Sequence, residues 1–216
     1  MTHNLSETNS IANRFVAELR DINIQKDRMR FRRNLERIGE VMAYEISKHL
    51  HYERIEVETQ LGLAVLEVPN ERIVLATIFR AGIPMHQGML NYFDDAESAF
   101  VSAYRRNHKD GTFEIALEYI SCPNLDDCTL IVSDPMLATG ASMHLAIEEL
   151  LKFGLPARIF VVTAIASAQG VDQIRRSAPA AKIWMAALDE ELTAKSFIVP
   201  GLGDAGDLAY GPKLQE

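Results

Sequence analysis

Residues 129–142 read TLIVSDPMLATGAS, and this stretch decides the fold. Its apolar run at residues 130–132 is typical of an interior parallel strand, and Asp134 follows where that strand ends. Small residues at 138–142 then lead into a helical pattern. Small side chains let backbone N–H groups approach an anion, and the positive end of the next helix adds to the attraction. We call residues 134–142 the phosphate loop, because the pattern predicts a phosphate cradle beside a carboxylate.

Apolar strands and amphipathic helices alternate on both sides of this loop. The alternation predicts an α/β protein with a mostly parallel central sheet flanked by helices. We expect a single domain of residues 1–216, with residues 1–50 as an N-terminal helical arm and residues 1–10 irregular. The expected strands are 72–79, 98–104, 113–119, 129–133, 158–165 and 182–187, with 54–68 extended. The expected helices are 11–19, 27–50, 83–93, 141–153 and 169–177.

Residues 106–120 are predicted to form a protruding β-hairpin. An Asp-Gly turn signal stands at 110–111, and apolar and polar residues then alternate through 113–119. This alternation indicates a half-buried strand with one wet face. We expect the hairpin to act as a lid that excludes water.

Composition excludes several classes of protein. The chain has 216 residues, 48% of them hydrophobic, and a formal net charge of −8, which argues against nucleic-acid binding through bulk electrostatics. No apolar run approaches the roughly 20 residues of a membrane span, and the N-terminus lacks the pattern of a secretory signal. The spacing of Cys122 and Cys128 does not match a CxxC pair, so we expect two separate thiols. The expected location is the cytoplasm, and the expected class is an enzyme.

Arginines are concentrated between residues 28 and 37, at positions 28, 30, 32, 33 and 37. Such a run is typical of a solvated or subunit-facing helix surface, and an RNA-contacting patch is the alternative. Arg80 comes at the end of a buried strand beside Ala81 and Gly82. Its planar donor fork suits a diphosphate, although a structural ion pair with a carboxylate fits equally well. Arg105, next to Tyr104, has the same two interpretations.

The C-terminal segment, residues 188–216, contains the glycine-rich stretch IVPGLGDAGDLAYG at 198–211. Backbone N–H and C=O groups exposed by glycine can read a flat heterocycle that presents donors and acceptors. A flexible tail is the alternative, but it would leave Ile198, Val199, Leu202 and Tyr210 needlessly exposed. The sequence therefore predicts a base-binding segment.

Two of these motifs together resemble one family. DPMLATGAS resembles the phosphoribosyl-pyrophosphate (PRPP) loop of uracil phosphoribosyltransferases, and IVPGLGDAGD resembles their uracil-binding segment. Similar spacing holds for FRAG at 79–82 and for YR at 104–105, and the resemblance spans about residues 28–211. It implies the type I phosphoribosyltransferase fold and the conversion of uracil and PRPP into UMP and pyrophosphate. It also implies a homo-oligomer, a dimer or higher.

Site residues follow from the resemblance position by position. Asp134, Asp204 and Arg105 are the implied catalytic residues, and Asp204 is the nearest candidate for a general base. Magnesium is the implied cofactor, held mainly by PRPP, with Asp204 as its candidate protein ligand. The implied uracil contacts are Ile198, Gly203, Asp204 and Ala205. The implied PRPP contacts are Arg80, Arg105, Asp134, Pro135, Met136, Leu137, Ala138, Thr139, Gly140, Ala141, Ser142 and Asp204.

The sequence departs from the family pattern at Gly140-Ala141, where two glycines are common. Alanine at 141 would matter only if that position needs a positive φ. Two alternatives to the enzyme share the fold: an RNA-binding pyrimidine regulator, and a catalytically inactive relative that binds PRPP. The net charge and the C-terminal segment argue against the first. Intact Asp134, Thr139 and Asp204 argue against the second.

Overall fold

The computed structural model describes residues 1–107 and 113–213, and for 103–107 and 113–117 it describes the backbone alone. A central sheet has the strand order β1-β10-β9-β7-β4-β5-β6, with β8 paired to β9 beside this path. Every neighbouring pair is parallel except β5 and β6. The strands are β1 (Thr2–Asn4), β4 (Ile73–Phe79), β5 (Glu97–Asn107), β6 (Phe113–Ser121), β7 (Thr129–Ser133), β8 (Met136–Leu137), β9 (Arg158–Ser167) and β10 (Lys182–Asp189).

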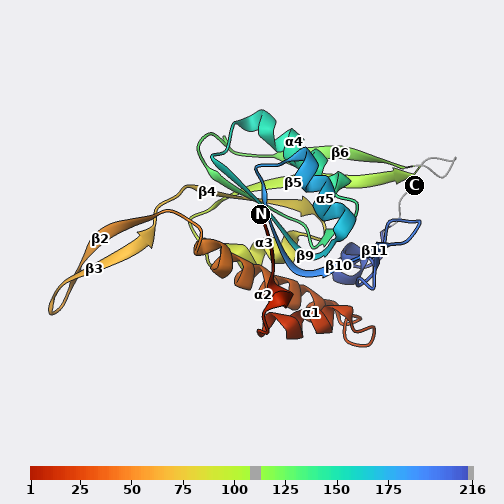
Figure 1. Ribbon diagram of the computed structural model, residues 1–216, viewed down its shortest axis with the longest axis horizontal. Helices are drawn as coiled ribbons and strands as arrows, with labels where there is room; N and C mark the ends of the chain where they lie inside the picture. Colours follow the sequence, from red (N-terminus) through yellow and green to blue (C-terminus); the bar gives the residue numbers. More distant parts are fainter. Residues whose placement is uncertain (108–112, 214–216) are drawn as a thin grey trace.

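Helices cover both faces of this sheet (Figure 1). The central strands are apolar on both sides, so Leu75 and Ile131 face one core while Ala76 and Val132 face the other. The first core is closed by α1 (Ala12–Arg20), α2 (Arg28–Ser47), α3 (Ile83–Leu90) and α6 (Ala205–Tyr210). The second is closed by α4 (Ala141–Leu150), which continues as the 3₁₀ turn η2 (Leu151–Phe153), and by α5 (Ala168–Ser177). The predicted α/β class is confirmed.

The expectation that residues 1–10 are irregular is wrong. Thr2–Asn4 add an edge strand that pairs in parallel with Ile183–Met185 of β10, and the turn η1 (Leu5–Glu7) follows. The His3 ring stacks on the Trp184 ring with centroids 3.9 Å apart. A strand of three residues is too short to show a period in the sequence, so only its partner in the fold reveals it.

Within the described residues, two further pairs of strands lie outside the central sheet. The first, β2 (Tyr52–Thr59) with β3 (Gly62–Pro69), is an antiparallel hairpin that projects from the body on the left of Figure 1. We call this β2–β3 hairpin the arm; it is distinct from the N-terminal helices of residues 1–50. The second, β11 (Glu191–Leu192) with β12 (Ile198–Val199), lies in the C-terminal segment. Among residues 1–107 and 113–213, no helix has the length and hydropathy needed to cross a bilayer.

The predicted hairpin at 106–120 is formed by β5 and β6, which pair from Phe100↔Ser121 to Asn107↔Phe113. Its strands are longer than the sequence indicated, and the pairing shifts register between Ser102 and Ala103. The Asp-Gly turn at 110–111 lies outside the described residues, so the predicted lid stays a prediction.

Candidate functional site

The phosphate loop begins at the carboxyl end of β7, whose five residues are all buried. The Asp134 N–H donates to the Val162 carbonyl at 3.1 Å, and the Met136 N–H donates to Asp134 Oδ1 at 3.4 Å. The chain then pairs with β9 through β8. Because β7 precedes Asp134 and β8 follows it, the Asp134 carboxyl is fixed at the carboxyl ends of the central strands, as the sequence predicted.

Gly140 gives the loop its turn into α4. Its φ is +80°, and a Cβ there would lie 2.9 Å from Gln173 Cβ and 3.0 Å from the Gly170 carbonyl oxygen. Ala141 is already the first residue of α4, so it has no need of a positive φ. The departure from two glycines is therefore compatible with the fold, since the first position alone requires glycine.

The N-cap and the first turn of α5 pack against the phosphate loop. Ser167 Oγ donates to the Ala138 carbonyl and accepts a hydrogen bond from the Gly170 N–H at 2.9 Å. A Cβ on Gly170 would lie 2.5 Å from the carbonyl oxygens of Leu137 and Ala138. Sequence reasoning did not single out Ser167 or Gly170. The available signal was Ser167 itself, a helix-capping residue at the end of an apolar strand.

Asp134 and Asp204 lie close enough to influence each other. Burial raises the pKa of the Asp134 carboxyl to about 7, the Met136 N–H lowers it, and the Asp204 carboxylate raises it further. Two carboxylates that face one site are expected when a cation or a polyhydroxylated ligand comes between them. Residues 70 positions apart in sequence therefore share one site.

The C-terminal segment is packed into the core. Ile198 and Ala205 are buried in the same core as α1 and α2. Gly201 and Gly203 have φ of +55° and +98°, and a Cβ at 201 would lie 2.2 Å from the Ile198 carbonyl oxygen. The backbone here is fixed in a shape that other residues rarely adopt, so the flexible-tail alternative is excluded.

Arg20 of α1 holds this segment in place. Its guanidinium donates to both carboxylate oxygens of Asp189 at 2.7 and 2.8 Å, and to the Gly201 carbonyl at 3.0 Å. The Gly201 N–H donates to Asp189 Oδ2 at 2.9 Å. Sequence reasoning missed both Arg20 and Asp189, because partners so far apart in the chain leave no local pattern.

Asp204 is the N-cap of α6, and its Oδ1 accepts a hydrogen bond from the Asp207 N–H at 2.9 Å. Asp207 in turn accepts a hydrogen bond from Arg80 Nη2 at 3.0 Å. Arg80 follows β4, the strand next to β7, and a Cβ at Gly82 would lie 3.1 Å from the Ser133 carbonyl oxygen. The structure therefore brings Arg80, Asp134 and Asp204 together at the carboxyl ends of β4 and β7.

Most of the arginine run serves the chain itself. Arg30 and Asn34 donate to the buried Glu18 carboxylate, and these hydrogen bonds lower its pKa to about 2. Arg32 donates to the Ala209 carbonyl at 2.7 Å, and Arg33 pairs with Glu36. Because Arg30 and Arg33 are paired with carboxylates, the run has less free charge to offer RNA than its sequence indicates.

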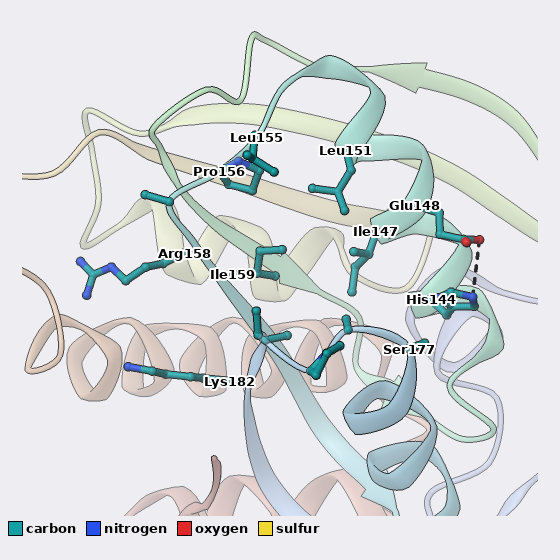
Figure 2. A pocket seen from close by; sticks show the side chains of 15 residues that line it. His144, Ile147, Glu148, Leu151, Leu155, Pro156, Arg158, Ile159, Ser177 and Lys182 are labelled. Atoms are coloured by element: carbon teal, nitrogen blue, oxygen red, sulfur yellow. Dashed lines mark ion pairs between the residues drawn. The ribbon is translucent and has the colours of Figure 1, made fainter.

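A cavity of about 390 Å³ lies away from this site, between α4, α5 and the starts of β9 and β10 (Figure 2). Ile147, Leu151 and Ile159 contribute to its apolar lining, and His144 and Glu148 at its edge are 3.5 Å apart. Because it is at the opposite ends of the strands from Asp134, it contains none of the predicted site residues.

Comparisons with known proteins identify the family of the chain. The family model described as uracil phosphoribosyltransferase matches residues 6–212. The chain belongs to the uracil phosphoribosyltransferase family. A uracil phosphoribosyltransferase of Porphyromonas gingivalis is 56% identical over 97% of this chain and 98% of its own length.

Solved structures similar to this member of the uracil phosphoribosyltransferase family agree on the fold. A protein from Aquifex aeolicus superposes with a TM-score of 0.87 at 30% identity, and all of both chains is covered. A hypoxanthine phosphoribosyltransferase of Staphylococcus aureus superposes with a TM-score of 0.50 at 11% identity, over 73% of this chain and 74% of its own. The second likeness concerns the fold alone.

The position of the Arg105 side chain, which belongs to the uracil phosphoribosyltransferase motifs, is not described. Arg105 lies in β5, but its side chain is outside the described part of the chain. Its role therefore stays a prediction.

Replacing Gly140 with alanine tests the phosphate loop. We expect the KM for PRPP to rise about tenfold, since the new Cβ meets Gln173 and the φ is unfavourable for alanine. Ala141→Gly is the matched control, with kcat/KM within about twofold of wild type and a loss of roughly 0.5–1 kcal/mol in stability from glycine in a helix. Steady-state kinetics at saturating uracil measure both, and equal KM values for the two variants would contradict the assignment.

Proposed function

We propose that the protein transfers the phosphoribosyl group of PRPP to uracil, giving UMP and pyrophosphate. The observation that carries this proposal is the meeting of the phosphate loop with the C-terminal segment at the neighbouring carboxylates Asp134 and Asp204. One half of the site suits a phosphorylated sugar and the other suits a flat base. The family supplies the reaction that joins them.

PRPP binding is assigned to the phosphate loop. The N–H groups at the start of α4 and the hydroxyls of Thr139 and Ser142 would bind the 5-phosphate, where the helix end favours negative charge. Asp134 would accept hydrogen bonds from the ribose hydroxyls and stabilise the positive charge that develops on the sugar. The assignment is supported by the fixed backbone around Gly140 and Gly170.

Uracil binding is assigned to Ile198, Gly203, Asp204 and Ala205. The fixed turns at Gly201 and Gly203 present backbone groups to a flat ring, and a rigid set of donors and acceptors selects among bases better than a mobile one. Holding the ring nitrogen against the sugar carbon lowers the entropic part of the barrier.

Mg²⁺ fits the donor set of this site. Asp134 and Asp204 supply hard oxygen atoms, and within the described residues no cluster of three or more His, Cys, Asp or Glu side chains could hold a metal unaided. This favours an ion held mainly by the phosphates of PRPP, with Asp204 as its protein ligand. When bound, the ion would neutralise charge on the departing pyrophosphate. Arg80 and Arg105 would share that role, and Asp204 is the candidate general base.

A base panel tests the function. Purified protein with PRPP and Mg²⁺ is offered uracil, cytosine, thymine, hypoxanthine and orotate, and pyrophosphate release is measured for each. We expect rapid release with uracil, together with UMP of matching amount. Release with another base and none with uracil would overturn the substrate assignment.

We also propose that the protein acts as a homo-oligomer in the cytoplasm. The two free thiols, Cys122 and Cys128, are typical of a reducing compartment. On one face of the arm, the directly opposed pairs Ile55↔Leu66 and Val57↔Ala64 form an apolar stripe, and 51% of Leu66 is exposed. An isolated two-stranded hairpin is marginally stable in water, so a second copy is the expected cover for this stripe.

Substituting Leu66 with glutamate is expected to reduce the molar mass in solution, because a charge placed on the apolar stripe opposes burial. Light scattering after size-exclusion chromatography measures that mass. Glu67→Gln, on the opposite face beside Arg54, is the matched control and should leave it unchanged. A monomeric wild type, or an unchanged oligomer in Leu66→Glu, would argue against the arm as the interface.

A further inference from the structure

Arg80 contacts α6 and the residue that follows this helix, and these contacts fix the orientation of its guanidinium. Its Nη2 donates to Asp207 Oδ1 and to the Gly211 carbonyl, both at 3.0 Å. The side chains of the pair are 37% and 38% exposed, so the ion pair contributes little to folding. An ion pair of small energetic value is better explained by the orientation that it imposes on the arginine.

The geometry leaves the rest of the guanidinium available. A guanidinium has five N–H donors, and the two on Nη2 are used by Asp207 and Gly211. Within the described part of the chain, Nε and Nη1 have no hydrogen-bond acceptor. The three remaining donors can therefore bind an anion while Asp207 keeps the planar group from rotating.

Gly206 provides a second, independent observation. A Cβ at this position would lie 3.8 Å from Arg80 Nη2 and 3.2 Å from Asp204 Oδ1. The first turn of α6 therefore lies close against the guanidinium, with no side chain between them. The backbone that carries Arg80 is fixed as well, because a Cβ at Gly82 would lie 2.2 Å from Thr77 Oγ1.

We propose that Asp207 is a positioning residue, which aims Arg80 at the diphosphate of PRPP and so links the base-binding segment to the PRPP site. This inference rests on the proposed function, since it assigns PRPP as the ligand of Arg80. Asp204 is the N-cap of the helix that contains Asp207, and it accepts the Asp207 N–H at 2.9 Å, so the two residues are fixed relative to each other. Side-chain entropy supports the assignment, because a guanidinium that Asp207 already holds loses less rotamer freedom when the diphosphate binds.

A double-mutant cycle tests the proposal by calorimetric titration with PRPP and Mg²⁺, in the absence of any base. Asp207→Ala should weaken PRPP binding about tenfold, and Asp207→Asn, which keeps the oxygen acceptor but lacks the charge, should weaken it less. In the Arg80→Ala background, Asp207→Ala should have no further effect, because a residue that acts through Arg80 has nothing left to position. Asp172→Ala, which removes an exposed ion pair on α5, is the matched control and should bind PRPP as the wild type does.

Three results would overturn the proposal. Additive losses in the double mutant would show that Asp207 acts independently of Arg80. Tighter binding in Asp207→Ala would show that its carboxylate competes with PRPP. A fall of more than a few degrees in the Tm of Asp207→Ala, with an equal loss of affinity in a separate titration with uracil, would show a structural role. Because PRPP binding is measured directly, a wild type that binds PRPP but makes no UMP would contradict the proposed function and leave the cycle interpretable.

Discussion

Replacing Asp134 with asparagine should lower kcat/KM for PRPP by at least about 100-fold, the cost typical of removing one group that stabilises transition-state charge. Asparagine has nearly the same shape as a protonated aspartate, so the Met136 N–H keeps its acceptor and the loop keeps its structure. Only the negative charge is lost. Initial rates at limiting PRPP measure the effect, and a loss below tenfold would remove Asp134 from the chemistry.

The pH dependence of the same pair of proteins provides a second measurement. With the pKa of Asp134 raised to about 7, the carboxylate forms only as the pH rises through 7 in the free protein. The wild-type kcat/KM for PRPP should therefore increase across that range, while the residual activity of Asp134→Asn should not show this step. A wild-type profile that is flat between pH 6 and 8 would contradict the assignment.

Stability should change in the opposite direction. The pKa of Asp134 is higher in the folded protein than in the unfolded chain, so the unfolded state loses its proton first as the pH rises from about 4 to 7. Stability falls over this window and then levels off. Asp134→Asn avoids that loss, and its Tm at pH 8 should exceed that of the wild type by on the order of 10 °C. Below pH 4 the difference should vanish.

Asp204→Ala should lower kcat/KM for both substrates by about 100-fold or more. The carboxylate lies near Asp134, and it also accepts the N–H of Asp207 at the start of α6. Its loss removes a negative charge from the site and an N-cap from the helix, where a Ser, Thr, Asn or Asp cap is worth about 1 kcal/mol. Steady-state kinetics and thermal unfolding measure the two losses separately.

Asp204→Asn distinguishes these two roles. Asparagine caps helices as well as aspartate does, so this variant should keep the wild-type Tm. If the charge is what the reaction needs, its kcat/KM should be as low as that of Asp204→Ala. Recovery of activity in Asp204→Asn would instead identify Asp204 as a structural cap, and the search for a general base would have to move elsewhere.

The phosphate loop was predictable because all of its signals are local. A consecutive apolar run indicates a strand buried on both faces, and Gly140 before a helical pattern indicates the tight turn. The sequence also raised the question of whether Ala141 needs a positive φ. Only the backbone shows that Gly140 has the positive φ and that Ala141 does not need one.

Contacts between distant parts of the chain could not be predicted in this way. Arg20 and Arg32 donate to groups 169 and 177 positions away, and neither arginine stands out from its neighbours in the helical pattern. The arginine run was therefore open to several interpretations until the positions of Glu18 and Ala209 were known. Arg80 is a further example of a contact that the sequence could not predict. It forms a structural ion pair with Asp207 and still has donors free for a diphosphate, so its two interpretations are compatible.

The hydrogen bonds that Arg20 makes to Asp189 and Gly201 also have a consequence for synthesis of the protein. A ribosome releases the chain from its N-terminus, so α1 is complete long before its partners exist. The strands β4 and β7 and the phosphate loop are made in between. A nascent chain can therefore contain the phosphate loop while it still lacks Asp204 and Asp207, and both substrate sites are completed only when Asp189 and Gly201 reach the first helix.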